Sequence, residues 1–234
     1  MADLKVVLVH GAFADASGWR PVHDELKGEV GTLLAPPNPL RGLVPDAEYI
    51  SSVLDQIGGP ILLVGHSYGG AVITVAGVND AVVGLVYVAG FCPDEGEALG
   101  PLAGKFPEPS GQPHLQPAPL PGGGAELAFD FPSFHESFCA DVPADDAAFM
   151  GISQRPLSAS VFEEPASAAA WKSKPSWAVL PTADNAISPE LHRFSYERSG
   201  ATVTEIEGSS HVAMISHPDV VTGVIRDAIS SLSA

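Results

Sequence analysis

The sequence is poor in cysteine. Only two of its 234 residues are cysteines, Cys92 and Cys139, and neither has a partner at metal-ligand spacing. Two thiols make no disulfide framework, which excludes the small secreted scaffolds that depend on several bridges. We therefore expect two free, partly buried thiols in a reducing compartment, and no metal site.

Positive charge and long apolar runs are also scarce. The chain has 11 Lys and Arg against 28 Asp and Glu, a formal net charge of −17. A surface this acidic repels nucleic acid and anionic membranes. No apolar run approaches the roughly 18 residues that a membrane-spanning helix needs, and no signal-peptide pattern precedes the first apolar run. We therefore expect a cytoplasmic protein whose partner is a small-molecule substrate.

Apolar runs and helical patterns alternate through most of the chain. Runs rich in β-branched residues, typical of buried strands, are followed by segments with apolar side chains at helical spacing. Their short links predict an α/β fold with a mostly parallel sheet of about six strands flanked by helices. The expected strands are 4–9, 30–34, 61–64, 82–88, 176–180 and 202–206, and the expected helices are 18–26, 46–57, 70–78, 188–198 and 218–232.

Residues 93–172, here called the insert, interrupt this alternation. They are rich in proline and contain no convincing strand pattern, but short helices are expected at 96–104, 133–140 and 143–153. An excursion this long between two strands is typical of a functional lid. We predict one domain, with a core of 1–92 and 173–234 and a helical lid inserted before the last two strands. For 107–124, poor in large apolar side chains, an unstructured loop is the alternative.

A possible nucleophile lies between a strand and a helix. The strand at 61–64 leads directly into Gly-His-Ser-Tyr-Gly at 65–69, and a helical pattern follows at once. A Gly-x-Ser-x-Gly sequence in this context forms a tight turn that exposes the serine side chain. Glycine two residues before and two residues after the serine leaves no Cβ to clash in that turn. The pattern predicts that Ser67 is a nucleophile.

A serine hydroxyl needs a base, which is normally a histidine oriented by a carboxylate. On a parallel sheet these groups come from loops at the carboxyl ends of strands. His211 follows the last predicted strand and Asp184 follows the strand before it. We therefore predict His211 as the base and Asp184 as the acid, in the chain order serine, acid, histidine. Asp94, which follows the strand at 82–88, is the alternative acid.

Negative charge on the substrate oxygen needs preorganised N–H donors. The backbone N–H after the nucleophile, that of Tyr68, is one predicted donor. The other is expected in the loop after the first strand, His-Gly-Ala-Phe at 10–13. We predict the N–H of Ala12, with Phe13 as the alternative, and Gly11 allows the backbone to approach closely.

With these residues the sequence resembles the α/β-hydrolase superfamily along nearly its whole length. It looks most like the small-lid branch that includes plant hydroxynitrile lyases and methyl-salicylate-type esterases. The resemblance implies a Ser-His-Asp triad under a helical lid. The lyases of this branch carry threonine where this chain has Gly11 and lysine where it has Val212. Valine cannot stabilise a cyanide leaving group, so the esterase is favoured. The matching segments are 10–12, 65–70, 184, 187–190 and 210–211.

We therefore predict a serine hydrolase that cleaves a small carboxylic ester through an acyl-enzyme, without cofactor or metal. The alternatives are other reactions of this fold (C–C bond hydrolysis, hydroxynitrile lysis, cofactor-free haloperoxidation) or a non-catalytic protein that binds a ligand. The substrate pocket should be apolar and lie under the insert. Its predicted lining is Phe13, Phe91, Phe129, Phe131, Phe138, Phe149 and Trp171.

Overall fold

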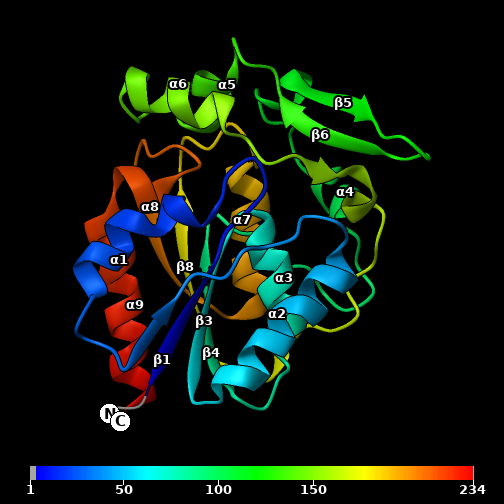
Figure 1. Ribbon diagram of the computed structural model, residues 1–234. Helices are drawn as coiled ribbons and strands as arrows, with labels where there is room; N and C mark the ends of the chain where they lie inside the picture. The colour runs from blue at the N-terminus through cyan, green and yellow to red at the C-terminus, as the bar shows by residue number, and fades with distance from the viewer. Residues whose placement is uncertain (1–3, 234) are drawn as a thin grey trace.

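A parallel sheet forms the centre of the protein (Figure 1). The computed structural model describes residues 4–233, and within them six strands pair in the order β2-β1-β3-β4-β8-β9. Every pair in this sheet is parallel. The strands are β1 (Lys5–Val9), β2 (Thr32–Leu34), β3 (Ile61–His66), β4 (Val82–Val88), β8 (Ser176–Pro181) and β9 (Thr202–Ile206). The α/β fold, its parallel sheet and all six predicted strands are confirmed.

Helices cover both faces of the sheet. Helices α1 (Arg20–Leu26) and α9 (Pro218–Leu232) lie on one face (Figure 1). The other face carries α2 (Leu43–Ile57), α3 (Tyr68–Ala76) and α7 (Pro189–Ser199). Every residue of α3 is buried, as expected for a helix that is apolar on all sides. These five helices were expected, and each ends within about three residues of its predicted bounds.

The insert lies over the carboxyl ends of the central strands (Figure 1). Its three expected helices are present as α4 (Leu99–Ala103), α5 (Phe134–Phe138) and α6 (Ala144–Ile152). The expectation that it contains no strand was wrong, because β5 (Leu115–Pro119), β6 (Ala125–Phe129) and β7 (Leu157–Ser158) form a small antiparallel sheet. Strand β5 contains two prolines, which are tolerated because β5 is an edge strand.

Short helical turns complete the described chain. One α-helical turn, α8 (Ala213–Ser216), and four 3₁₀ turns were not expected as separate elements. The 3₁₀ turns are η1 (Ala16–Trp19), η2 (Gln112–His114), η3 (Ala159–Phe162) and η4 (Ala170–Lys172). Sequence periodicity does not detect elements of three or four residues, because one turn contains too few side chains to define a face.

The two cysteines are free and buried, as expected. Burial raises the pKa of the Cys92 and Cys139 thiols to about 12. Within residues 4–233, the helices are all too short or too polar to cross a membrane.

Candidate active site

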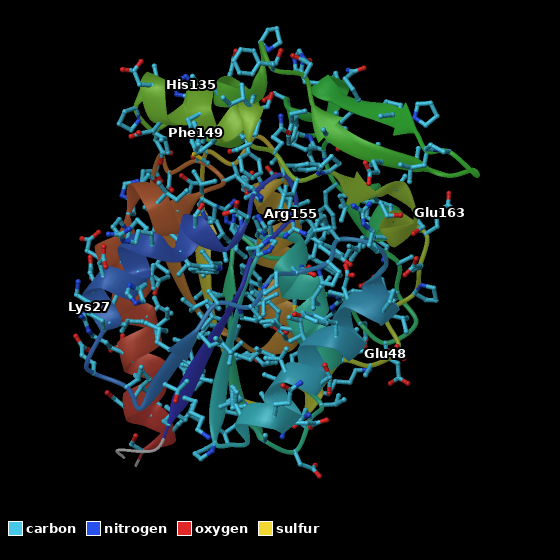
Figure 2. All side chains as sticks on the ribbon, in the orientation of Figure 1. Lys27, Glu48, His135, Phe149, Arg155 and Glu163 are labelled. Atoms are coloured by element: carbon cyan, nitrogen blue, oxygen red, sulfur yellow. The ribbon has the colours of Figure 1, made fainter. Side chains whose placement is uncertain are left out.

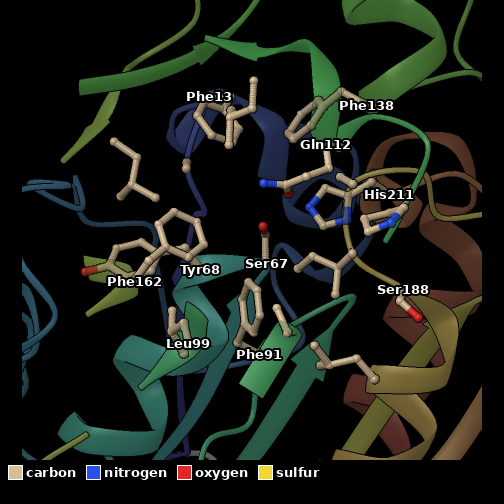
Figure 3. Close-up of a pocket in the computed structure, with 18 of the residues that line it drawn as sticks. Phe13, Ser67, Tyr68, Phe91, Leu99, Gln112, Phe138, Phe162, Ser188 and His211 are labelled. Atoms are coloured by element: carbon tan, nitrogen blue, oxygen red, sulfur yellow. The ribbon is translucent and has the colours of Figure 1, made fainter. Parts of the chain in front are cut away.

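Ser67 occupies a strained turn between β3 and α3. Its backbone has φ 55° and ψ −124°, a positive φ that costs a non-glycine residue about 1–3 kcal/mol. Hydrogen bonds hold this conformation: the Ser67 N–H donates to Val88 O at 3.1 Å, and Ser67 O accepts from the N–H groups of Gly70 and Phe91 at 2.9 and 3.0 Å. The turn directs the Ser67 hydroxyl into a cavity (Figure 3).

The glycines around Ser67 are required by close backbone packing. A Cβ on Gly65 would lie 2.5 Å from Gly69 O, and a Cβ on Gly69 would lie 2.5 Å from Val9 O. A Cβ on Gly70 would lie 2.5 Å from Phe91 O. Because each obstacle is backbone, a larger side chain would displace the turn itself.

His211 lies in the loop after β9 and is 1% exposed. Its Nδ1 is 2.7 Å from Asp184 Oδ2, so Nδ1–H donates to the carboxylate and Nε2 remains for the cavity. The His211 and Ser67 side chains both line this cavity. Within residues 4–233 no hydrogen bond joins Ser67 Oγ to His211, a contact that is often loose until substrate binds.

Asp184 is buried after β8 and accepts four hydrogen bonds. Oδ1 accepts from the N–H groups of Ala186 and Ile187 at 2.8 and 2.9 Å, and Oδ2 accepts from His211 Nδ1 and from His192 Nε2, at 3.1 Å. Burial alone would raise the pKa of Asp184, but the attraction of His211 and these hydrogen bonds hold it well below its usual range. Asp184 therefore stays ionised beside His211.

Asp94, the alternative acid, lies elsewhere. Its side chain is 34% exposed and pairs with Lys172 Nζ at 2.5 Å. This ion pair lowers the pKa of Asp94 but makes no contact with His211. Of the two candidate carboxylates, the structure brings only Asp184 to His211.

Two further histidines support this arrangement and were not singled out by sequence reasoning. His192 is the second donor to Asp184, and its position in the first turn of α7, eight residues after Asp184, is the only signal that could have indicated it. The Nε2 of His66 donates to His211 O at 3.0 Å. Burial lowers the pKa of His66 far below its usual value, so its ring is neutral. The His66 ring lies 4.8 Å from that of His211.

The Ala12 and Phe13 N–H groups in the loop after β1 differ in their hydrogen bonds. The Phe13 N–H is occupied, because it donates to Arg155 O at 3.0 Å; Figure 2 shows Arg155, a residue of the insert, where the insert meets the rest of the protein. Among residues 4–233 no acceptor bonds the Ala12 N–H. Tyr68 begins α3, so its N–H has no helical carbonyl to bond. Of the two loop candidates, Ala12 is therefore the available donor.

A buried histidine holds this loop. The Nδ1–H of His10 donates to Gly11 O at 2.8 Å, and Nε2 accepts the N–H of Asn38 at 2.9 Å. The Asn38 side chain donates to His10 O at 3.0 Å. Burial lowers the pKa of His10 to about 4, so the ring is neutral and can donate from one nitrogen while it accepts at the other.

The cavity beside Ser67 has a mostly apolar lining. Four of the seven predicted aromatic residues line it: Phe13, Phe91, Phe129 and Phe138. Sequence reasoning missed the other residues that line the cavity, because none of them was recognised as part of a motif. They are ordinary side chains of the insert and of the segment after Asp184. They include Leu99, Gln112, Leu115, Leu157, Phe162, Ile187 and Leu191. No cluster of three or more His, Cys, Asp or Glu side chains within residues 4–233 is placed to hold a metal ion.

The other three predicted aromatic residues do not reach the cavity, and this expectation was wrong. Phe131 and Phe149 are on the surface of the insert, 54% and 69% exposed. The Trp171 indole N–H donates to Pro93 O at 2.8 Å, and its ring packs under the guanidinium of Arg198. Residue type predicted apolar character at these positions, but not the side of the insert on which each lies.

Several solved structures share this architecture. A pyrethroid hydrolase from Sphingobium faniae JZ-2 matches with a TM-score of 0.77 and 20% sequence identity over 96% of both chains. Polyneuridine aldehyde esterase matches with a TM-score of 0.81 and 19% identity over 97% of this chain and 99% of its own. Tomato methylketone synthase I, complexed with 2-tridecanone, matches with a TM-score of 0.77 and 21% identity over 99% of this chain and 100% of its own.

At these identities the structural likeness establishes the fold alone. Comparison with curated proteins gives no match. The sequence model of the alpha/beta hydrolase family, however, matches residues 6–224, nearly the whole chain. The chain therefore belongs to the alpha/beta hydrolase family.

Proposed function

We propose that the protein is a serine hydrolase that cleaves a small carboxylic ester through an acyl-enzyme. The observation that carries this proposal is the placement of Ser67 and His211 on one apolar cavity, with Asp184 bonded to the far nitrogen of His211. A nucleophile, a base and a group that orients the base are the three parts that this chemistry needs.

The reaction follows from these positions. His211 Nε2 takes the hydroxyl proton as Ser67 Oγ attacks the ester carbonyl, and Asp184 holds the ring and stabilises its charged form. The N–H groups of Ala12 and Tyr68 stabilise the oxyanion. His211 then gives its proton to the departing alcohol and later activates the water that hydrolyses the acyl-enzyme. Substrate binding is expected to bring Ser67 and His211 into hydrogen-bond contact.

Ester cleavage is favoured over lyase chemistry by two positions. Val212 is fully buried beside His211 and has no charge to offer a cyanide leaving group. A Cβ on Gly11 would lie 2.6 Å from Ser67 Cβ, so a threonine at this position would displace the nucleophile. Two of the similar structures are described as an esterase and a pyrethroid hydrolase, which also favours ester hydrolysis.

The test is covalent labelling combined with turnover. A fluorophosphonate probe is expected to label Ser67, and Ser67→Ala is expected to abolish both labelling and hydrolysis of p-nitrophenyl acetate. Ser52→Ala is the matched control, because the Ser52 hydroxyl is on the surface of α2, where it donates to Tyr49 O. Undiminished hydrolysis by Ser67→Ala would exclude the mechanism, while labelling without turnover of any ester would favour a ligand-binding protein.

A further inference from the structure

The cavity beside Ser67 contains few polar side chains. Apart from Ser67 and His211, its polar lining consists of Tyr68, Gln112 and Ser188. No Lys, Arg, Asp or Glu among the described residues lines it. A ligand that fills this cavity therefore meets apolar surface and at most three further polar groups, which decide its orientation.

Two of these three polar groups are already committed within the protein. The Tyr68 hydroxyl donates to Asp46 Oδ2 at 2.7 Å, and the Ser188 hydroxyl donates to Glu190 Oε2 at 2.6 Å. The side-chain amide of Gln112, in contrast, forms no hydrogen bond with any residue in 4–233. It brings two N–H donors and one carbonyl acceptor to the cavity.

The uncommitted amide is directed at the reacting groups. Figure 3 shows the Gln112 side chain reaching down from the insert, with its amide above Ser67 and between Phe13 and His211. A substrate carbonyl attacked by Ser67 must lie in this space. The amide and Ser67 therefore line the same space, in which the scissile bond of a substrate would lie.

The backbone that carries Gln112 is fixed to the loop of the candidate acid. The Gly111 N–H donates to Asn185 O at 2.8 Å, and a Cβ on Gly111 would lie 2.5 Å from that oxygen. Asn185 directly follows Asp184, and the Gln112 N–H donates to Pro109 O at 3.0 Å. The amide is thus positioned relative to the same loop that holds His211.

We propose that Gln112 is a specificity-determining residue, whose amide hydrogen-bonds an oxygen of the substrate close to the scissile carbonyl. The preferred substrate is then a neutral, largely apolar ester that carries one such oxygen, in its alcohol or its acyl part. Gln112 is exposed to solvent as well as to the cavity, and the cavity wall offers its amide no partner, so a ligand that displaces water from the cavity must supply that partner itself. This inference rests on the proposed esterase function.

Matched ester pairs test it. On the alcohol side, 2-methoxyethyl butanoate is compared with butyl butanoate, which has the same number of chain atoms. On the acyl side, ethyl 3-methoxypropanoate is compared with ethyl pentanoate. The measured quantity is the ratio of kcat/KM for the ether ester to that for the apolar ester, in wild type, Gln112→Met and Gln116→Met. Methionine keeps the side-chain length but has no donor. Gln116 is the control, because its side chain does not line the cavity and its amide donates to Pro113 O.

Gln112→Met is expected to lower this ratio about 3- to 10-fold in at least one pair, the range for loss of one neutral hydrogen bond. The pair that responds identifies the side of the ester that faces Gln112, and Gln116→Met should keep the wild-type ratio. An unchanged ratio in both pairs, or an equal change in Gln116→Met, overturns the assignment of Gln112 while ester turnover stands. If wild type hydrolyses none of the four esters, the proposed function fails and this inference fails with it.

Discussion

Replacing Asp184 by asparagine tests the candidate acid at the level of single atoms. The N–H groups of Ala186 and Ile187 both donate to Oδ1, so the asparagine carbonyl oxygen is expected to take that position. Its NH₂ group then replaces Oδ2, the atom that accepts hydrogen bonds from His211 Nδ1 and His192 Nε2 in the wild-type protein. The NH₂ group, itself a donor, therefore faces two N–H donors. Two donors cannot bond each other, so His211 must carry its proton on the other nitrogen.

A His211 ring protonated on Nε2 cannot take the proton of Ser67. We expect Asp184→Asn to lower kcat for p-nitrophenyl acetate by roughly 10³–10⁴, as loss of the correct tautomer does in other triads. Two charge-assisted hydrogen bonds are lost as well, so the free energy of unfolding should fall by about 2–4 kcal/mol. Denaturant unfolding measures this second effect and verifies that the variant is folded at the assay temperature.

The effect of Asp184→Asn on the free energy of unfolding should also depend on pH. The pKa of Asp184 is depressed in the folded protein, so its carboxylate stabilises the fold above its unfolded pKa of about 3.9, and this contribution is lost as the pH falls through the folded pKa. The difference in unfolding free energy between wild type and Asp184→Asn should therefore be largest near neutral pH and shrink in acid. Asp94→Asn, the control, should leave kcat unchanged. A large loss of kcat in Asp94→Asn, with Asp184→Asn active, would refute the assignment.

Two further predictions follow from packing and burial. Gly11→Ala should lower kcat roughly 10²-fold, because the added Cβ would lie 2.6 Å from Ser67 Cβ and displace the Ser67 side chain. Gly223→Ala is the control and should leave kcat unchanged, because a Cβ there meets nothing within 4 Å. An equal loss of kcat in both variants would contradict this reasoning. The thiols of Cys92 and Cys139, whose pKa burial raises to about 12, should react with a disulfide reagent at pH 8 only after denaturation, and rapid reaction in the native protein would show that they are accessible.

Local pattern predicted the central sheet and its helices well, since buried β-branched runs and helical spacing are properties of the segment itself. It failed in the insert, where strand β5 contains Pro117 and Pro119 and is stabilised by its pairing with β6 rather than by its own residues. Whether a proline is tolerated depends on whether its strand lies at the edge of a sheet, and the sequence of a single segment does not contain that information.

In the candidate site, too, the sequence indicates the positions of residues but not their contacts. Ser67 lies in a contiguous motif, and the positions of Asp184 and His211 at strand ends follow from topology, so the sequence could indicate all three as candidates. Their contacts could not, because the 2.7 Å approach of His211 to Asp184 joins residues 27 positions apart. The same limit explains why His192 was not anticipated and why Phe149 was placed in the pocket. The hydrogen-bond partners of a side chain, and the side of the insert on which it lies, depend on tertiary packing.

The link between the insert and the reacting groups has an evolutionary consequence. Two of its contacts use main-chain atoms alone: Arg155 O accepts the Phe13 N–H, and the Gly111 N–H donates to Asn185 O. Main-chain contacts are kept when side chains change, as long as the backbone path is preserved. The insert can therefore diversify its cavity-facing residues, Gln112 and Phe129 among them, while the loops that carry the candidate site residues stay in register. Selection for new substrates can then act on this segment at little cost to the reaction chemistry.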